Sequence, residues 1–379
     1  MSTVDGAARA RPRFFDTRAA YMMFLTTTTE KAEVAARIAR EARQVAPGPD
    51  AFRLFDAGLG DATVLVEVMR SLHALHPHVP WLVVGKEISI EDVRIALDRL
   101  PDRFHEHPEM VFVVTNMTYG EATNLRPGPG KGEVSWRRTA LEGATTVGFA
   151  QQIRSLHDTL AADWQVTTSP RTGNPVYVRP AVHVIYRKDR EFILRRVLPD
   201  PSTYRAAFDL VIASQPYRAR TPTEQKVRAV IAPLARALAP GGRLLGIHAY
   251  GHDPGMEIIR TLWPDEDPFR TDRRALLAEA ARQLSSPADR DLVMEEWDDS
   301  ESVFRYEMRA MPVEAKEHIG TSAILAAWNA AAYVAQIDEE RMEEAVAFGA
   351  YHDGTRSVLR RHGRVWFNNE SYVIRREPA

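Results

Sequence analysis

The chain contains no cysteine among its 379 residues. Disulfide bonds, thiolate nucleophiles and zinc or iron–sulfur sites built on cysteine are therefore excluded. It also lacks a run of about 18 apolar residues, so no segment is expected to span a bilayer. The opening residues, MSTVDGAARARPRFF, have no apolar stretch of the kind that signal peptides carry. We therefore expect a cytoplasmic protein without a membrane partner.

Neither sign of charge is in large excess. The 49 Lys and Arg residues nearly balance the 51 Asp and Glu residues, and no basic tail or long basic run occurs. This pattern argues against a nucleic-acid partner and leaves a small molecule as the expected ligand. The 45% apolar and 26% charged content is that of an ordinary globular protein. The length suits one large domain with insertions, or two domains.

Strand and helix patterns alternate in two parts of the chain. Strands are expected at 52–56, 80–86, 110–115, 208–217, 243–250, 303–311 and 364–376. Helices are expected at 62–75, 90–100 and 221–238. The first strand segments are almost entirely apolar, as in a parallel sheet that is covered on both faces. The alternation predicts an α/β fold with a doubly wound, mostly parallel sheet of about seven strands.

The alternation stops between residues 121 and 204. This stretch is expected to hold a glycine- and proline-rich loop at 126–133, a helix at 141–163 and a hairpin of strands at 175–187 and 191–199. An insertion of this length between strands three and four is usually a cap or an oligomer contact. The predicted division is therefore N-terminal helices at 1–46, a core at 47–120 and 205–379, and an inserted cap or hairpin subdomain at 121–204. Helical additions, including 323–336, are expected near the C-terminus.

A glycine turn follows the first strand, in the segment 51-AFRLFDAGLGDATVL-65. Glycines at this place bring bare main chain next to a ligand above the strand ends. A dinucleotide-binding turn has glycines at positions i, i+2 and i+5. Gly58 and Gly60 fit that spacing, but Thr63 occupies the third position. The match to a pyrophosphate-binding turn is incomplete.

The run from Asp56 to Ala62 resembles motif I of the class I S-adenosylmethionine-dependent methyltransferases, with alanine at Ala62 where that family usually has glycine. The resemblance implies a Rossmann-like seven-strand fold and S-adenosylmethionine as the cofactor. It implies that Glu87, at the end of the second strand, accepts hydrogen bonds from the ribose hydroxyls. It also implies that Asn116, at the end of the third strand, contacts the adenine. Residues 208–217 and the sequence LAPGGRLLGI resemble the family's fourth and fifth strand motifs.

The core at 47–120 and 205–379 would then be the cofactor-binding catalytic core. Its candidate cofactor-binding residues are Asp56, Gly58, Gly60, Asp61, Glu87, Asn116 and Ser214. Each also has a purely structural interpretation: a plain strand–helix turn for the glycines, a helix cap for Asp56, a solvated strand-end acid for Glu87 and a turn residue for Asn116.

The exit from the fourth strand, Ser214-Gln215-Pro216-Tyr217, resembles a motif of amino methyltransferases that act on nucleobases or glutamine amides. In that motif a polar side chain and a backbone carbonyl accept from the target amine, and the aromatic ring stacks on the substrate. Gln215 replaces its first proline. Gln215 and Tyr217 are therefore candidate substrate-binding residues, and Tyr217 is also a candidate catalytic residue. A tight turn with a packed tyrosine is the alternative.

A second polar group follows the fifth strand, in 248-HAYGHD-253. His248 and His252 are candidate catalytic residues because the pKa of histidine suits a general base near neutral pH. Tyr250 is a candidate substrate contact. A His-x3-His spacing on a loop is weak evidence for a metal site, and we expect no metal.

The N-terminal run YMMFLTTTTEK and Pro216-Tyr217 resemble, over a few residues, small-molecule amine methyltransferases of the histamine N-methyltransferase type. Tyr21 and Phe24 lie in this run. In many small-molecule methyltransferases this segment folds over the cofactor, which makes Tyr21 a candidate substrate contact. Packing into the core is the alternative.

The function expected from the sequence is methyl transfer from S-adenosylmethionine to a nitrogen or oxygen of a small molecule. An activated donor needs an aligned, dry acceptor rather than a fixed catalytic triad. The alternatives are amino methylation of a nucleobase or protein amide, a non-catalytic S-adenosylmethionine-binding protein, and a dinucleotide oxidoreductase. A homodimer is one expected assembly.

Overall fold

The computed structural model describes residues 18–170, 173–309 and 321–378. Ten strands form one central sheet, and they are β1 (Phe52–Asp56), β2 (Trp81–Lys86), β3 (Met110–Thr115), β4 (Ser135–Leu141), β7 (Ala181–Arg187), β8 (Phe208–Ser214), β9 (Leu238–Ala249), β10 (Leu292–Met294), β11 (Val303–Glu307) and β12 (Trp366–Arg376). A separate hairpin consists of β5 (Val166–Thr168) and β6 (Pro175–Tyr177).

The central strands run in the order β10-β12-β9-β8-β1-β2-β3-β7-β4, and β11 pairs with β12. The five strands from β9 to β3 are mutually parallel. The outer strands β12 and β7 pair antiparallel with β9 and β3. The chain moves outward from β1 to β3 and then crosses to β8 on the other side of β1, so the strand order reverses between β1 and β8. Ligands of doubly wound sheets bind beyond the carboxyl ends of the strands at such a point.

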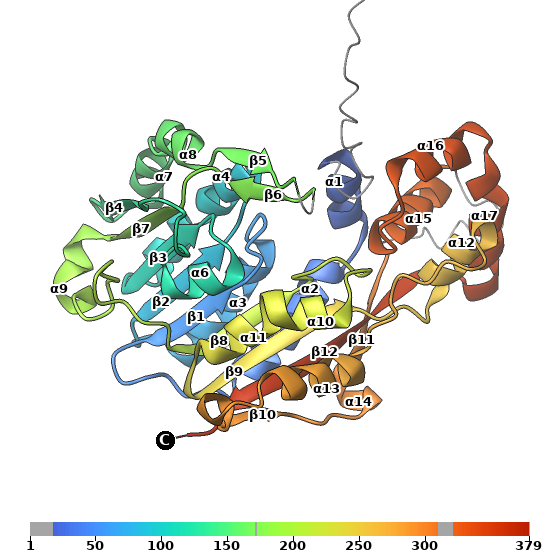
Figure 1. Ribbon diagram of the computed structural model, residues 1–379. Helices are drawn as coiled ribbons and strands as arrows, with labels where there is room; N and C mark the ends of the chain where they lie inside the picture. The colour runs from blue at the N-terminus through green and yellow to red at the C-terminus, as the bar shows by residue number, and fades with distance from the viewer. Residues whose placement is uncertain (1–17, 171–172, 310–320, 379) are drawn as a thin grey trace, which may run out of the picture.

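Helices cover both faces of the sheet (Figure 1). They are α1 (Arg18–Thr27), α2 (Glu30–Ala42), α3 (Thr63–Leu75), α4 (Ile90–Asp98), α5 (Pro101–Glu106), α6 (Tyr119–Asn124), α7 (Thr146–Arg154), α8 (His157–Asp163), α9 (Glu191–Leu194), α10 (Thr223–Lys226), α11 (Ala232–Arg236), α12 (Pro254–Leu262), α13 (Arg273–Gln283), α14 (Asp299–Ser302), α15 (Thr321–Val334), α16 (Glu339–Ala347) and α17 (Ala350–His362).

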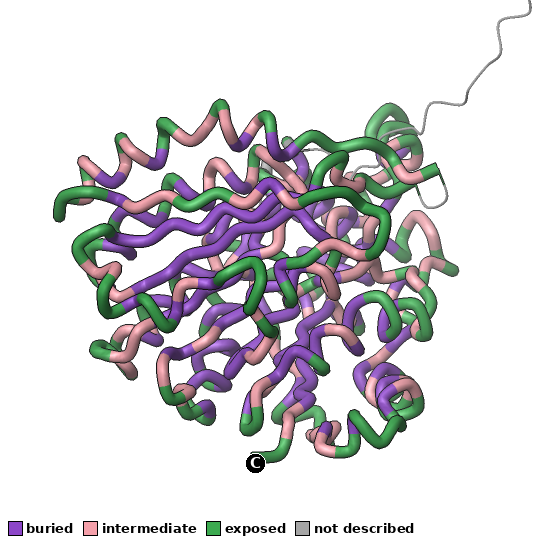
Figure 2. The backbone as a smooth tube through the Cα atoms, turned by 60° about the vertical axis from the view of Figure 1, so that its left-hand side comes forward, coloured by how far each residue is buried: buried purple, intermediate pink, exposed green. Residues whose placement is uncertain are grey.

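Three apolar clusters make up the core. One packs α2, α3, α4, α7 and α8 on one face of the sheet, and a second packs α6, α11 and α13 on the other face. The third joins α1 to α12, α15, α16 and α17, which gather at one end of the molecule in Figure 1. The central strands are buried along most of their length (Figure 2). The predicted fold class, a doubly wound and mostly parallel α/β sheet, is therefore confirmed. No helix within the described ranges is long and apolar enough to cross a membrane.

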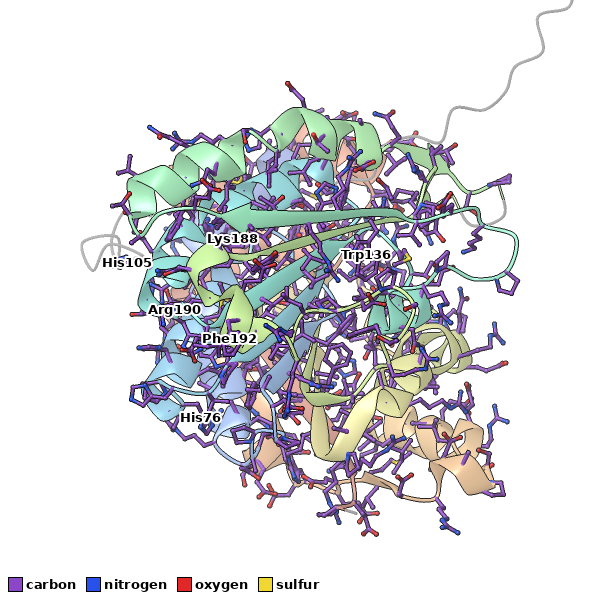
Figure 3. The ribbon with its side chains drawn as sticks, turned by 90° about the vertical axis from the view of Figure 1, so that its left-hand side faces the viewer. His76, His105, Trp136, Lys188, Arg190 and Phe192 are labelled. Atoms are coloured by element: carbon purple, nitrogen blue, oxygen red, sulfur yellow. The ribbon has the colours of Figure 1, made fainter. Side chains whose placement is uncertain are left out.

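The insertion differs from the predicted hairpin. Strand β7 pairs with β3 and strand β4 pairs with β7, so the insertion adds two strands to the sheet. The short strand β10, which was not predicted either, brings the sheet from the predicted seven strands to ten. The predicted strand at 191–199 is wrong, because Glu191–Leu194 forms the helical turn α9. That turn buries Leu194 and leaves Phe192 78% exposed beside the sheet edge (Figure 3). The division into a core and an inserted subdomain remains a proposal.

Other helix and strand boundaries also differ from the predicted ones. The helix predicted at 141–163 is two helices, α7 and α8, and the strand β4 before them was not predicted. The helix predicted at 221–238 contains a π-helical turn at Val227–Ile231, shortly before Pro233. The predicted N-terminal helices are α1, which ends at Thr27, and α2, which begins at Glu30. Part of the strand predicted at 303–311 lies outside the described residues.

Candidate functional site

The glycine turn lies at the carboxyl end of β1, beside the point where the strand order reverses. Gly60 has a φ of +50°, in the left-handed region that glycine enters without steric cost. Ala62 also has a positive φ of 60°, where a side chain costs roughly 1–2 kcal/mol. This conformation accounts for the family's preference for glycine at the position of Ala62. A Cβ atom on Gly58 would meet only the carbonyl of Ser214, at 3.6 Å. The chain itself therefore leaves room over Gly58.

Asp56 ends β1 and is buried beneath this turn. Its Oδ1 atom accepts a hydrogen bond of 3.0 Å from the amide of Gly58. Burial raises the pKa of Asp56 to about 6, and the charge of Glu87 raises it further, while the Gly58 hydrogen bond acts in the opposite direction. A buried acid with an elevated pKa at a strand end suits a role in binding a cationic group.

The burial of Asp56 gives a testable pH dependence. Because its folded pKa lies above the ordinary value of 3.8, the stability that Asp56 contributes is present below pH 4 and is lost as the pH rises through about 6. The variant Asp56→Asn cannot ionise. Its free energy of unfolding should exceed that of the wild type by an amount that grows between pH 4 and pH 8, on the order of 2 kcal/mol. Urea unfolding at the two pH values measures the change.

The control for this prediction is Asp98→Asn, because Asp98 is exposed at the end of α4. It should show no such growth with pH. An equal gain for Asp56→Asn at pH 4 and pH 8 would contradict the assigned cause.

Glu87 extends from the end of β2 back to the glycine turn. Its Oε2 atom accepts from the amide of Gly60 at 2.9 Å. Its Oε1 atom accepts from the amides of Ile88 and Ser89 at 2.7 and 2.8 Å. A carboxylate offers about four lone-pair sites, so Oε2 retains capacity for a further donor. The structure therefore brings Glu87 and Gly60, 27 residues apart in sequence, into one polar group.

Two of the predicted cofactor residues shape the turn itself. Asp61 accepts from the amide and the hydroxyl of Thr63 and forms an ion pair with Arg99 at 3.0 Å. Ser214 ends β8 and faces Gly58 through its carbonyl group. Both residues lie at the carboxyl edge of the sheet with contacts inside the chain, and their contact with a cofactor stays a prediction.

Asn116 has a different set of contacts from the one that the resemblance implies. Its amide nitrogen donates to the carbonyls of Asp163 and Arg179, at 3.1 and 2.9 Å. Its amide oxygen accepts from the amide of Ala181 at 2.9 Å. The side chain is 1% exposed. Asn116 thus holds the insertion against the end of β3, and both of its N–H donors are already used within the chain.

A cavity of about 500 Å³ opens beside Asn116, at the ends of β2 and β3. Its lining comes from the strand ends, from the residues just before α6, from the glycine-rich loop and from strand β6, and includes Lys86, Ile88, Met117, Thr118, Lys131 and Tyr177. Strand β6 of the observed β5–β6 hairpin, which is not the hairpin predicted from the sequence, therefore borders this part of the carboxyl edge. Ile88, which lines the cavity, directly follows Glu87 in the chain. The cavity therefore borders the polar group that Glu87 forms with Gly60.

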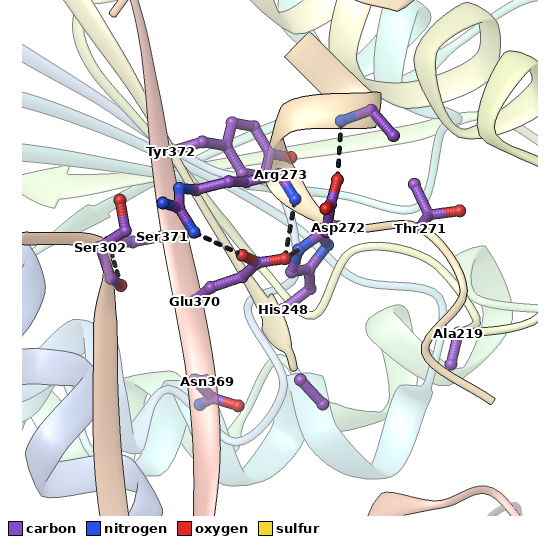
Figure 4. Close-up of polar contacts among 12 residues, drawn as sticks. Ala219, His248, Thr271, Asp272, Arg273, Ser302, Asn369, Glu370, Ser371 and Tyr372 are labelled. Atoms are coloured by element: carbon purple, nitrogen blue, oxygen red, sulfur yellow. Dashed lines mark hydrogen bonds and ion pairs between the residues drawn. The ribbon is translucent and has the colours of Figure 1, made fainter. Parts of the chain in front are cut away.

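Tyr217 and His248 belong to a buried network on the other face of the sheet. The Tyr217 hydroxyl lies 2.8 Å from His248 Nδ1, and His248 Nε2 lies 2.8 Å from Glu370 Oε1. Glu370 also accepts from the backbone and guanidinium of Arg273, at 2.7 and 3.0 Å (Figure 4). A carboxylate only accepts, so His248 donates from Nε2 and a singly protonated ring accepts from Tyr217 at Nδ1. Both nitrogens of His248 are engaged in the chain.

The contacts of Tyr217 also bear on the amino-methyltransferase interpretation. Burial raises the pKa of the Tyr217 hydroxyl well above its usual value, so the hydroxyl stays protonated. The ammonium of Lys226 lies 5.0 Å from the ring centroid. Gln215 has a φ of +48°, and its amide contacts Asn369 and the backbone of Ala249 at 3.3 Å each. No contact found among the described residues favours stacking of Tyr217 on a planar substrate.

The remaining candidates lie on the loop after β9. His252 has a φ of +55°, and its ring centroid lies 5.1 Å from that of Tyr250. Asp253 accepts from the amide of Met256 and thereby caps α12. The loop thus stands at the carboxyl edge, while His248 points into the buried network.

A second cavity, of about 180 Å³, lies at the ends of β8 and β9. It is lined by Tyr21 and Phe24 of α1, by Glu30 and Lys31 of α2, by Gln215 and Ala249 at the strand ends, by Tyr306 of β11 and by Tyr333, Val334 and Gln336 at the end of α15. The Tyr21 hydroxyl adjoins the glycine turn, since a Cβ on Gly60 would meet it at 3.7 Å. The prediction that α1 folds over the crevice agrees with this position.

Sequence reasoning missed Glu30, Lys31, Tyr306 and Tyr333 as site residues. Glu30 and Lys31 were interpreted only as helix formers after the threonine run, and Tyr333 as part of a packing helix. Nothing in the local sequence links residue 31 to residue 333. A charged pair directly after the break between two N-terminal helices was the one available signal.

Comparison with known proteins finds no matching family model and no match among curated proteins. Solved structures with a similar arrangement include a candidate sarcosine dimethylglycine methyltransferase from Galdieria sulphuraria, at 9% identity over 92% of this chain and 85% of that one, with a TM-score of 0.35. A geranyl diphosphate methyltransferase in complex with S-adenosylmethionine aligns at 13% identity over 92% and 90% of the two chains, with a TM-score of 0.32. TM-scores this low do not support an inference about the activity of this chain. The assignment of a doubly wound, Rossmann-like fold rests on the strand order and the position of the glycine turn.

Proposed function

We propose that this protein transfers a methyl group from S-adenosylmethionine to a nitrogen or oxygen of a small molecule. The observation that carries the proposal is the contact between the Glu87 carboxylate and the Gly60 amide at 2.9 Å, where the strand order reverses. A carboxylate at this place offers acceptors for the two neighbouring hydroxyls of a ribose. The open main chain at Gly58 suits the adjoining part of the nucleoside.

The cofactor residues have distinct roles in this proposal. Asp56 faces the ammonium of the methionine part, while Asp61 and Ser214 hold the turn in shape. The cavity beside Ile88 suits the flat apolar ring of adenine, with Asn116 acting as the support of its wall. The predicted direct contact between Asn116 and the adenine stays a prediction.

Methyl transfer from a sulfonium needs positioning more than proton transfer. The cofactor supplies an activated methyl group when bound, and the chain must hold the acceptor in line and exclude water. The cavity under α1 and α15 supports a small acceptor, because it is small and adjoins Gly60 through Tyr21. Tyr217 and His248 support the wall behind this cavity, and Gln215 lines it. His252 and Tyr250 remain candidates for the substrate side.

A thermal-shift experiment tests the cofactor class. S-adenosylhomocysteine at 100 times its dissociation constant should stabilise the protein by about 2.7 kcal/mol, whereas NAD should not shift the melting temperature. Methyl transfer from labelled S-adenosylmethionine to a panel of small amines, amino acids and phenols then tests catalysis. A shift by NAD alone would favour the oxidoreductase alternative. Binding of S-adenosylhomocysteine without any transfer would favour a non-catalytic binding protein.

A further inference from the structure

Glu30 and Lys31 form an incompletely satisfied charged pair inside the cavity under α1. Glu30 is 4% exposed, and its buried Oε2 atom has no hydrogen-bond partner in the part of the chain that the structure describes. The Lys31 ammonium lies 3.4 Å from that oxygen. Burial alone would lower the pKa of Lys31, but the charge of Glu30 together with Tyr21, Tyr333 and Asp61 raises the pKa above its usual value, so the ammonium stays protonated. The oxygens of a buried carboxylate normally all accept hydrogen bonds. The Oε2 atom of Glu30 accepts none from the described residues, which points to a ligand as the missing donor.

Aromatic side chains enclose the charged pair. The Lys31 ammonium lies 5.8 Å from the centroid of the Tyr21 ring. Tyr333 stacks on Phe24 with centroids 4.7 Å apart and lies 6.0 Å from Tyr21. Tyr306 closes the cavity from β11. Such walls exclude water and offer ring faces to a cationic group.

The charges of the cavity define the ligand that it would accept. A simple ammonium would meet Glu30 but would be repelled by Lys31, and a simple carboxylate would have the opposite problem. A ligand with both charges satisfies both groups. The cavity volume of about 180 Å³ limits the ligand to a small molecule.

We propose that this cavity binds the methyl acceptor as a small α-amino-acid-type zwitterion, with its ammonium on Glu30 and its carboxylate on Lys31. The inference rests on the proposed function and deepens it by naming the substrate class.

The chemistry of the transfer is consistent with this placement. The acceptor ammonium first gives a proton to Glu30, whose Oε2 atom accepts no hydrogen bond within the described chain and is the adjacent base. The nitrogen lone pair then forms the new N–C bond to the methyl group, while the C–S bond breaks and its electron pair stays on sulfur. The product is an N-methylated ammonium, and the proton on Glu30 leaves to solvent when the product does. Glu30 is thereby assigned as a catalytic residue and Lys31 as a substrate-binding residue.

The test measures ligand preference by thermal shift, with and without saturating S-adenosylhomocysteine. The probes are the common α-amino acids and N-methylglycine. For every amino acid that shifts the melting temperature, the amine without its carboxylate and the acid without its ammonium are measured beside it. In the wild type an amino acid should bind at least about tenfold more tightly than either counterpart, since hydrogen bonds to charged groups are worth roughly 1.5–3 kcal/mol.

Variants separate recognition from structure. Lys31→Met removes the cation, so the preference should move from the amino acid toward its amine, and Lys31→Arg should keep the original preference. Glu30→Gln should weaken binding of the amino acid at least tenfold. Arg40→Met and Glu33→Gln are the matched controls, because both residues are exposed on α2 and Glu33 shares its first turn with Glu30. Neither control should alter ligand preference.

Three outcomes would overturn the inference: no amino acid binds, a bare amine binds as well as its amino acid, or Lys31→Met leaves the preference unchanged. A loss of stability in Glu30→Gln with unchanged preference would show that the pair only stabilises the start of α2. Failure of S-adenosylhomocysteine to bind would overturn the proposed function instead, and the preference of the cavity would still be judged from the measurements without it.

Discussion

Glu370→Gln is expected to lower the free energy of unfolding by about 3–5 kcal/mol. Glu370 is fully buried and neutralises Arg273, which is 3% exposed. Removing the carboxylate charge leaves the buried His248 N–H group without an anionic partner and leaves the Arg273 guanidinium with only the exposed Asp299 carboxylate, which costs several kcal/mol. Urea unfolding at pH 7 measures the change.

The control for this prediction is Glu377→Gln. Glu377 forms an exposed ion pair with Arg375 at 3.8 Å, so its replacement should change stability by less than about 1 kcal/mol. The double variant Glu370→Leu with Arg273→Met should recover part of the loss, because an apolar pair of similar size removes both charges. A loss equal to that of the control would show that the network of β9, β12 and α13 contributes little to stability.

Glu87→Ala is expected to weaken binding of S-adenosylhomocysteine by about 10- to 100-fold. Hydrogen bonds from ribose hydroxyls to a carboxylate are worth roughly 1.5–3 kcal/mol, and each 1.4 kcal/mol is a factor of ten. Isothermal calorimetry measures the dissociation constant. Glu91→Ala is the matched control, because Glu91 is an exposed acid four residues further along the same segment.

Glu87 also holds the amide of Gly60, so a loss of affinity could arise from a distorted turn. A ligand that lacks both ribose hydroxyls separates the two causes. The wild type should lose affinity for this ligand, whereas Glu87→Ala should bind it as well as it binds the parent ligand. An equal loss of affinity in both proteins would contradict the assignment of Glu87 to the ribose.

Several parts of the fold were predictable because they depend on local sequence. The apolar run Met110–Thr115 is typical of a strand buried on both faces, and Ser89 caps α4 through the amide of Asp92, as its side chain suggests. The insertion was harder to predict. The run at Glu191–Leu194 is apolar enough for a strand, yet it forms a helical turn after β7. The cytoplasmic location and the homodimer stay predictions from the sequence.

Some residues of the candidate site were likewise predictable from the sequence, and others were not. The glycine turn and the acid at the end of β2 were recognisable because each lies within a few residues of a strand end. Asn116 also lies at a strand end, but its side-chain amide is hydrogen-bonded to the insertion. Only the pairing of β7 with β3 in the folded chain reveals this. The two nitrogens of His248 are likewise engaged by residues 31 and 122 positions away along the chain.

The sequence by itself determined the alternation of strands and helices and the left-handed turn at Gly60, because periodicity and backbone sterics act over a few residues. Only the tertiary structure decided which polar groups stay open to a ligand. Glu30 has an unused acceptor and Asn116 has no unused donor, and the difference arises from segments that meet only when the chain is folded.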